Sequence, residues 1–318
     1  MSEVLGFDPH DPGRRAHYGE FYGLTELPDA PLFMVHGNCQ AESLRVLLHG
    51  AGEGRWHGVR IPPVHELLAE DLPHLTRLLN HCSFVATQPV ASGYRGLPLG
   101  SDEILALTPQ NSRAVKYPVM RWTALMPTLA IVRAPGVTDP PVAPYHDLRV
   151  LVAAAQGKHA VRLEPVSPAA VRGSRDESLH QLRTRQDAHG TVDAASLFEA
   201  AGPNAAHVIN HPSNEVLMGV ARAILAELGE PGEVADPGRA LLGGIRAPIY
   251  ESTLDALGYR PEDLAGGPRD HWIIGGEKVT EDDVAAEHLR WYAHFPQVVA
   301  AGMKRHERLI RAMNLIDQ

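Results

Sequence analysis

Apolar positions change their spacing several times along the chain. Residues 31–35 form a short continuous apolar run, which is typical of a buried strand. In residues 41–49, Leu44, Leu47 and Leu48 recur at the spacing of one helix face. A buried strand followed at once by an amphipathic helix predicts the first unit of an α/β fold.

The same alternation continues as far as residue 228. Further strands are predicted at residues 59–61, 82–87, 113–119 and 206–209. Helices are predicted at residues 64–80, with a kink at Pro73, and at residues 144–156 and 214–228. Because strands that alternate with helices form parallel sheets, we expect a three-layer α/β sandwich with a mainly parallel sheet.

The two ends of the chain have a different pattern. Residues 1–30 are rich in Pro, Gly and charge, and we expect an irregular N-terminal arm before an α/β core at 31–229. The segment 230–318 begins with Gly/Pro-rich sequence and ends in two predicted helices within 280–316. We interpret it as a loop-rich and helical C-terminal extension, either a cap on the core or an interface in a homo-oligomer.

Composition excludes several classes of protein. The chain has 318 residues, of which 44 % are hydrophobic and 21 % charged, as in ordinary globular proteins. Its net charge of −9 argues against nucleic-acid binding, which needs clustered Lys and Arg. There is no apolar run long enough to insert in a membrane and no apolar leader after Met1, so we expect a cytoplasmic protein.

The turn at Gly37-Asn38-Cys39-Gln40 is the sharpest candidate for chemistry. Gly37 allows a tight turn after the first strand, and Cys39 then stands at the start of the next helix. The positive end of that helix would lower the pKa of the thiol and favour a thiolate nucleophile. The alternative is that Cys39 is a small core residue that closes the turn.

Cysteine and histidine usage narrows the chemistry further. The only other cysteine is Cys82, in the strand predicted at 82–87, so two free thiols are expected in a reducing compartment. None of the 18 histidines stands in an HExxH motif or at a paired ligand spacing. We therefore predict no metal site.

His211 is the second candidate. It follows the strand predicted at 206–209 and precedes the helix predicted at 214–228, where it is either a general base or a histidine that caps the local backbone. The carboxyl ends of parallel strands share one edge of a sheet. We therefore expect Cys39, His211 and the Gly-rich loop at 88–100 to meet there.

The order of these motifs resembles that of SGNH hydrolases, which implies an SGNH- or flavodoxin-like sheet. In that superfamily Gly-Asp-Ser opens the core and Asp-x-x-His closes it, so Cys39 stands where the serine would be and His211 where the histidine would be. Val208 occupies the position of the acid, three residues before His211. The residues that could orient the imidazole in its place are Asn210, Asp147 and Asp102.

The residues within and around these motifs are more similar to those of the WcbI-like family of polysaccharide biosynthesis. The likeness covers about residues 31–228 and is carried by HGNCQAESLRVLL, QPVASGYRGLPLGSDEI, PYHDLRVL and NHPSNEVL. This resemblance implies that the protein binds coenzyme A and transfers an acyl group, most simply acetyl from acetyl-CoA, to a hydroxyl of a glycan or other polar small molecule.

Roles follow for the candidate residues. Cys39 and His211 are the catalytic candidates. Oxyanion-binding or orienting roles fall to Asn38, Gln40, Gly93 and Asn210. Residues expected to contact substrate or coenzyme A are Tyr94, Arg95, Arg113, Lys116 and His146.

Two mechanisms are open at this point. In the favoured one, Cys39 takes the acyl group and His211 activates the acceptor hydroxyl. In the other, His211 activates the acceptor for direct attack and Cys39 only shapes the pocket. The alternative functions are a cysteine esterase of SGNH type and a non-catalytic module that binds coenzyme A or a glycan.

Overall fold

The computed structural model describes residue 8 and residues 10–316, and its centre is a four-stranded sheet. The strands are β1 (Leu32–His36), β2 (His57–Gly58), β3 (Cys82–Thr87) and β4 (Arg113–Lys116). They pair in the order β2-β1-β3-β4, and every pairing is parallel. The predicted parallel sheet is confirmed.

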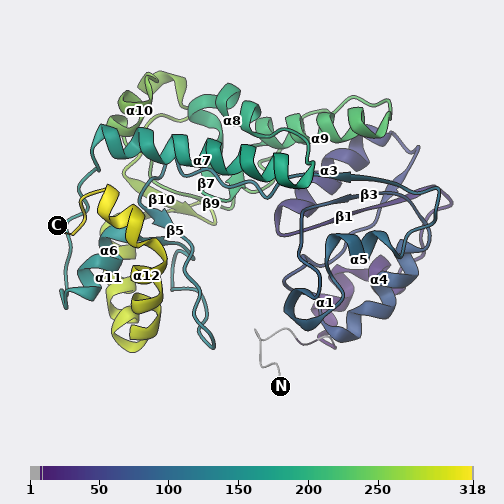
Figure 1. Cartoon of the computed structure of the whole chain (residues 1–318), viewed down its shortest axis with the longest axis horizontal. Helices are drawn as coiled ribbons and strands as arrows, with labels where there is room; N and C mark the ends of the chain where they lie inside the picture. Colours follow the sequence, from purple (N-terminus) through teal and green to yellow (C-terminus); the bar gives the residue numbers. More distant parts are fainter. Residues whose placement is uncertain (1–7, 9, 317–318) are drawn as a thin grey trace.

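Helices cover both faces of this sheet. One face packs against α3 (Gln40–Gly52) and α9 (Asn214–Leu228), and the opposite face packs against α2 (Gly19–Tyr22), α4 (Leu72–Leu79) and α5 (Ser101–Leu105) (Figure 1). Side chains of β1 alternate between the two apolar clusters. A strand buried on both faces has a continuous apolar run, as the sequence has at this point. The three-layer α/β sandwich is therefore confirmed.

The irregular arm expected for residues 1–30 is wrong over its described part. The chain forms α1 (Pro12–His17) before α2, and Phe21 of α2 is fully buried. Buried Asp71 accepts hydrogen bonds from Arg14 and Tyr22, at 2.8 Å each. A few apolar residues and one buried ion pair hold this segment on the sheet, although its composition is that of a loop.

Three element boundaries also differ from the prediction. The helix expected at 64–80 is divided into a 3₁₀ turn (Ala69–Asp71) and α4, so Pro73 lies in a first helical turn, where no amide hydrogen bond is lost. The strand expected at 59–61 is replaced by β2, an edge strand that begins two residues earlier, at His57. The helix expected at 144–156 is preceded by β6 (His146–Asp147), which pairs with β5 (Leu129–Ala130), and α6 (Leu148–Ala155) begins after Asp147 caps it.

The strand expected at 206–209 does not join the parallel sheet. Instead β7 (Ala206–Val208) pairs with β8 (His211–Pro212) in a small antiparallel hairpin, with Val208 opposite His211. The hairpin is joined to the chain beyond β4 by a bond from the Trp122 amide to the Ile209 carbonyl, at 2.7 Å. The assumption that His211 follows a strand of the main sheet is therefore wrong.

The remaining elements lie mostly away from the sheet. They are α7 (Pro168–His189), α8 (Ala195–Ala201), β9 (Ile245–Arg246), α10 (Glu251–Leu257), β10 (His271–Ile274), β11 (Glu277–Thr280), α11 (Glu281–His294) and α12 (Pro296–Ala312), with 3₁₀ turns at Tyr94–Gly96, Gly202–Asn204 and Pro261–Asp263. Strands β9, β10 and β11 form an antiparallel sheet. The two C-terminal helices were predicted, whereas α7, a polar helix of 22 residues, was not. Within the described chain, no helix is both long and apolar enough to cross a membrane.

The C-terminal helices share an apolar cluster with α6. Leu148 and Leu151 of α6 pack there with Tyr292 of α11 and Val298 of α12. Figure 1 shows these three helices together at the end of the molecule opposite the parallel sheet, while α7 extends between the two ends. The C-terminal extension is thus built around a helix from the middle of the chain.

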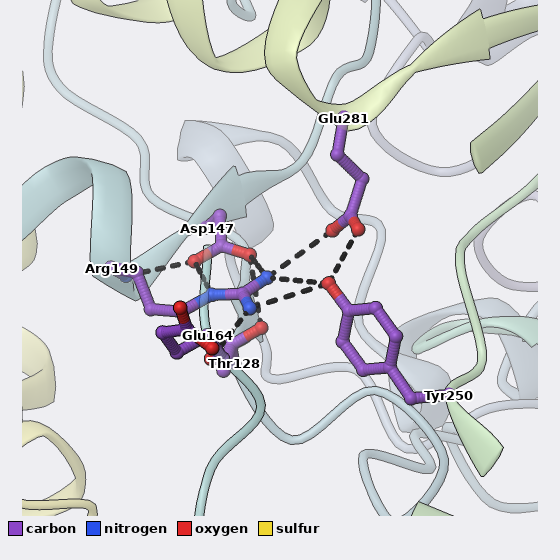
Figure 2. Close-up of polar contacts among 6 residues, drawn as sticks. All are labelled: Thr128, Asp147, Arg149, Glu164, Tyr250 and Glu281. Carbon is purple, nitrogen blue, oxygen red and sulfur yellow. Dashed lines mark hydrogen bonds and ion pairs between the residues drawn. The ribbon is translucent and has the colours of Figure 1, made fainter. Parts of the chain in front are cut away.

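A buried charge network fixes this arrangement (Figure 2). Arg149 of α6 is 7 % exposed and pairs with Asp147 at 2.6 Å and with Glu281, at the start of α11, at 3.3 Å. Tyr250 donates to Glu281 and accepts from Arg149. Burial by itself would lower the pKa of Arg149, but Asp147 and Tyr250 raise it overall, so the guanidinium is held charged.

Removal of the cation should therefore destabilise the protein strongly. We expect Arg149→Met to lower the free energy of unfolding by about 3–5 kcal/mol, because two carboxylates are then buried without a cation to pair with. Urea denaturation followed by circular dichroism measures this. The matched control is Arg162→Met, whose side chain is 89 % exposed beside Glu164 and should contribute less than about 1 kcal/mol. Equal effects of the two substitutions would contradict a structural role for the network.

Candidate active site

The turn between β1 and α3 is tightly packed. A Cβ atom at Gly37 would lie 2.5 Å from the Tyr117 hydroxyl and 2.7 Å from Gln88 Oε1, so only glycine fits. The amide of Asn38 donates to Gln88 Oε1 at 2.9 Å, and Asn38 Oδ1 accepts from the amide of Gln40 at 2.9 Å. Asn38 therefore caps the first amide of α3. The glycine at position 37 is explained by the close approach of Tyr117 and Gln88, not by an unusual φ.

The side chain of Gln40 joins four segments below this turn. It is fully buried, and its Nε2 donates to the carbonyls of Met120 at 2.7 Å and Asn210 at 2.8 Å. Its Oε1 accepts from the Met120 amide and from Gln88 Nε2. The expected oxyanion role is wrong for Gln40, because its side chain and its own amide are already used within the protein.

Cys39 lies beside this buried amide and is partly exposed. Burial raises the pKa of its thiol, and the amides of Cys39 and Gln40, together with the charge of Arg133, offset burial only in part. The thiolate expected at the helix start is therefore wrong for the protein alone. Desolvation outweighs the helix terminus, and the resting group is a neutral thiol.

His211 reaches the same region from the hairpin. Tyr145 donates from its hydroxyl to Asn210 Oδ1 at 2.7 Å, and the same oxygen lies 3.4 Å from His211 Nε2. Burial raises the pKa of Tyr145, and the nearby Cys39 raises it further, so both hydroxyl and thiol stay protonated. Tyr145 thus contacts the histidine and lies close enough to Cys39 for the cysteine to raise its pKa, and the sequence analysis did not select it.

His211 is neutral near pH 7. Burial lowers its pKa, and the backbone carbonyl of Leu242 opposes this only partly. Among the described residues, His211 Nδ1 makes no hydrogen bond of standard geometry. A neutral imidazole can accept a proton, which is the property that a general base needs.

The structure thus brings together Cys39, Gln40, Asn210 and His211, and among the residues expected from the Gly-rich loop it places Arg95 in the neighbourhood of Arg133, since both cations lower the pKa of His65. The amide of Gly93 donates to Glu103 at 3.0 Å, which leaves it no oxyanion role. Tyr94 packs under the sheet on the side of α4 and α5, and Arg95 donates to the carbonyl of His65.

The two expected cations of β4 have other partners. Lys116 pairs with exposed Asp102 at 3.4 Å, so Asp102 does not orient the imidazole. Arg113 lies at the opposite end of β4 and bonds the Leu228 carbonyl at 2.6 Å and Glu230. Because β4 runs parallel to β1, its first residue Arg113 lies at the edge of the sheet where the strands begin, whereas Cys39 lies at the edge where they end. Arg113 is therefore too far along the sheet for a role beside Cys39.

His146 and Asp147 also belong to other surroundings. His146 is 1 % exposed, bonds the Tyr292 hydroxyl at 2.6 Å, and has its pKa lowered to about 4 by burial and by His288. Asp147 belongs to the network of Arg149. Neither orients His211 or is free to bind substrate, because His146 is bonded to Tyr292 and Asp147 to Arg149 and Thr128.

Four arginines gather near the reactive side chains without a carboxylate partner. They are Arg121, Arg133, Arg185 and Arg305, and none forms an ion pair within the described residues. We call them the arginine cluster. Burial lowers the pKa of Arg121, and the other three cations lower it further. They come from four separate segments, so spacing in the sequence gives no signal of the cluster.

The reactive side chains of this site, Cys39, Tyr145 and His211, are therefore neutral and lie near the arginine cluster. Within the described part of the chain, no three His, Cys, Asp or Glu side chains gather as metal ligands would. The arrangement suits a base, a thiol and an anionic ligand.

Comparison with known proteins identifies the family. A family model described as polysaccharide biosynthesis enzyme WcbI matches residues 32–233, which is more than half of the chain. The chain belongs to this family. The polysaccharide biosynthesis resemblance seen in the motifs is thereby confirmed, and the protein is an enzyme by membership. No curated protein matches the sequence.

A solved structure agrees with the fold. The chain is similar to WcbI, described as a novel polysaccharide biosynthesis enzyme and as native protein without a disulfide bond between coenzyme A and one of its cysteines. The TM-score is 0.73 at 18 % identity, and the match covers 90 % of this chain and 99 % of that one. At this identity the likeness establishes the shared fold.

The two cysteines should differ in reactivity. We expect iodoacetamide to modify Cys39 faster than Cys82, because Cys82 is 2 % exposed and its pKa is raised to about 12 by burial. The rate at Cys39 should still rise with pH to above 9.0, the ordinary value for a thiol, since its own pKa is raised. Peptide mass spectrometry across a pH series measures both rates. A plateau of Cys39 labelling by pH 7 would contradict the neutral thiol.

Proposed function

We propose that this enzyme transfers an acyl group, in the simplest case acetyl, from coenzyme A to a carbohydrate hydroxyl. The family makes polysaccharides, which supports a glycan acceptor. The observation that carries the proposal is the neutral His211 beside Tyr145, whose pKa is raised in turn by the nearby, partly exposed Cys39. Such a base can activate a hydroxyl, and the same side chains can receive the thioester end of the donor.

The cysteine in contact with the donor should be Cys39. The relative of known structure is described as native protein without a disulfide bond between coenzyme A and a cysteine, and naming that bond at all supports a cysteine close enough to the thiol end of the donor to form it. This chain has two cysteines, and Cys82 is buried in β3 with its sulfur against the Leu78 carbonyl. Cys39 alone is accessible to such a ligand.

The phosphates of the donor suit the arginine cluster. Arg133 is close enough to lower the pKa of Cys39, and Arg121 is close enough to lower that of Tyr145. Arg133, Arg185 and Arg305 each lower the pKa of Arg121, and an anion bound among these four cations would offset that repulsion. Guanidinium groups bind phosphate oxygens in pairs, which matches the donor's charge and geometry.

The transfer step then needs one base. The acceptor oxygen attacks the thioester carbonyl carbon, a C–O bond forms, the C–S bond breaks, and the electron pair leaves on sulfur. His211 Nε2 takes the hydroxyl proton and passes it to the departing thiolate. Tyr145 already donates to Asn210, so its lone pairs face Nε2 and can accept the N–H formed there.

Cys39 has a binding role in this scheme. Its pKa is raised, and no hydrogen bond joins it to His211 in the described structure, so it lacks the activation that a nucleophilic thiol needs. We therefore favour direct transfer over an acyl-Cys39 intermediate. This reverses the preference that the sequence alone suggested.

Loss of one cation should weaken donor binding. We expect Arg121→Gln to reduce the affinity for coenzyme A about tenfold or more, because a charged hydrogen bond contributes about 1.5–3 kcal/mol. Calorimetry measures this, and exposed Arg308 supplies the matched control Arg308→Gln, which should bind normally. No binding to the unaltered protein at millimolar coenzyme A would remove the transferase proposal and favour the esterase.

Loss of the base should abolish most turnover. With acetyl-CoA and a glycan acceptor, His211→Ala should lower kcat on the order of 10²–10⁴-fold, and Tyr145→Phe about tenfold. Because its pKa is lowered, His211 stays a free base below 6.5, so the acid limb of kcat/KM should lie below that pH. His180→Ala, at an exposed helical position, is the control.

Intact-protein mass spectrometry distinguishes the mechanisms. Direct transfer predicts no acetyl adduct after mixing with acetyl-CoA alone and substantial activity in Cys39→Ser. An adduct that disappears in Cys39→Ser, together with lost turnover, would establish the covalent route. Full activity of His211→Ala would contradict both routes.

A further inference from the structure

A concavity lies beside the hairpin that carries His211. Its volume is about 510 Å³, and its wall includes β7, the first turn of α9 and the chain around β9. His207 lines it, whereas Cys39, Tyr145 and His211 do not. It is therefore separate from the acyl-transfer site, and its size suits a small organic ligand.

Three arginines line this concavity without a carboxylate partner. Arg239 lies in the segment after α9, Arg246 in β9, and Arg269 before β10. Within the described residues none of them forms an ion pair, and the one hydrogen bond from their side chains joins Arg269 Nε to the Ala247 carbonyl at 3.0 Å. Burial lowers the pKa of Arg269, and Arg246 lowers it further. Their outer nitrogens remain as donors for a ligand.

The start of α9 adds further unused donors. This helix has 15 residues, and its cap residue Ser213 makes no side-chain cap hydrogen bond. Ser213 is 8 % exposed, lines the concavity, and its Oγ has no partner among the described residues. His207 Nε2 is also buried without a partner in that part of the chain. A helix start with free N–H groups and neighbouring cations is a favourable position for an anion.

Two carboxylates share the wall and limit the choice of ligand. One oxygen of Asp236 accepts from the Gly238 amide, and Glu215 is exposed in the first turn of α9. A simple polyanion would meet these acids as well as the arginines. A ligand with one anionic group and several hydroxyls satisfies both, because hydroxyls donate to carboxylates.

We propose that this concavity binds a phosphorylated sugar, with the phosphate on Arg246, Arg269 and the start of α9 and the hydroxyls on Glu215 and Asp236. The site is separate from the arginine cluster, so it does not depend on acyl transfer at Cys39.

Calorimetry with glucose 6-phosphate, inorganic phosphate and glucose as probes tests the proposal. We expect glucose 6-phosphate to bind more tightly than phosphate, and glucose to bind least. Arg246→Gln should weaken glucose 6-phosphate binding about tenfold or more, and Arg239→Gln should weaken it in the same direction. Arg308→Gln, an exposed substitution with the same charge change, should have no effect.

A crossed comparison separates the two anion sites. Arg121→Gln should leave glucose 6-phosphate binding unchanged and weaken coenzyme A, while Arg246→Gln should do the reverse. Loss of glucose 6-phosphate binding in Arg121→Gln alone would assign the sugar phosphate to the arginine cluster and overturn the proposal. Binding of phosphate as tight as that of the sugar phosphate would overturn the hydroxyl contacts. Because Arg246 forms no side-chain bond that the fold uses in the described structure, its variant should fold, and circular dichroism verifies this.

Discussion

The buried amide of Gln40 is the interaction on which the site depends. A carboxamide side chain, as in glutamine and asparagine, offers two hydrogen-bond donors and two acceptor sites from one planar group. All four hydrogen-bonding positions of Gln40 are used here. Through them the start of α3 is joined to the ends of β3 and β4 and to the hairpin at Asn210. Within the described chain the hairpin pairs with no strand of the parallel sheet, so this amide and the backbone bond from Trp122 to Ile209 connect it to the core instead.

Burial around that amide also decides the charge state of the reactive groups. Cys39 and Tyr145 have raised pKa values and His211 a lowered one, with desolvation as the largest cause in each case. All three are therefore neutral at pH 7. The reacting side chains are uncharged at rest, and the ionisable groups near them are arginines and the carboxyl groups of Glu66 and Asp139. That is the arrangement expected of a base acting on a neutral hydroxyl beside an anionic donor.

Local signals predicted the sheet and part of the site. The strand at 82–87, the helix at 214–228 and the turn at Cys39 depend on neighbouring residues, and each has the pattern that its environment requires. The failures involve contacts that are distant in the sequence. Val208 looks like a sheet strand but pairs with His211, and no local spacing could reveal Tyr145, whose partners are more than sixty residues away.

Two kinds of buried arginine in this chain show how unpaired charge differs from paired charge. Arg149 has two carboxylates within reach, its pKa is raised, and its contacts are complete inside the protein. Arg121 has other cations around it instead, and its pKa is lowered. A fold gains nothing from an unpaired buried cation, since burial and repulsion both destabilise it. Where unpaired cations stand near a thiol, as Arg133 does at Cys39, or line a concavity, as Arg246 and Arg269 do, an external anion can remove the repulsion. The free energy of repulsion among the unpaired cations, which destabilises the folded protein alone, is then released when an anion binds and so contributes to its affinity.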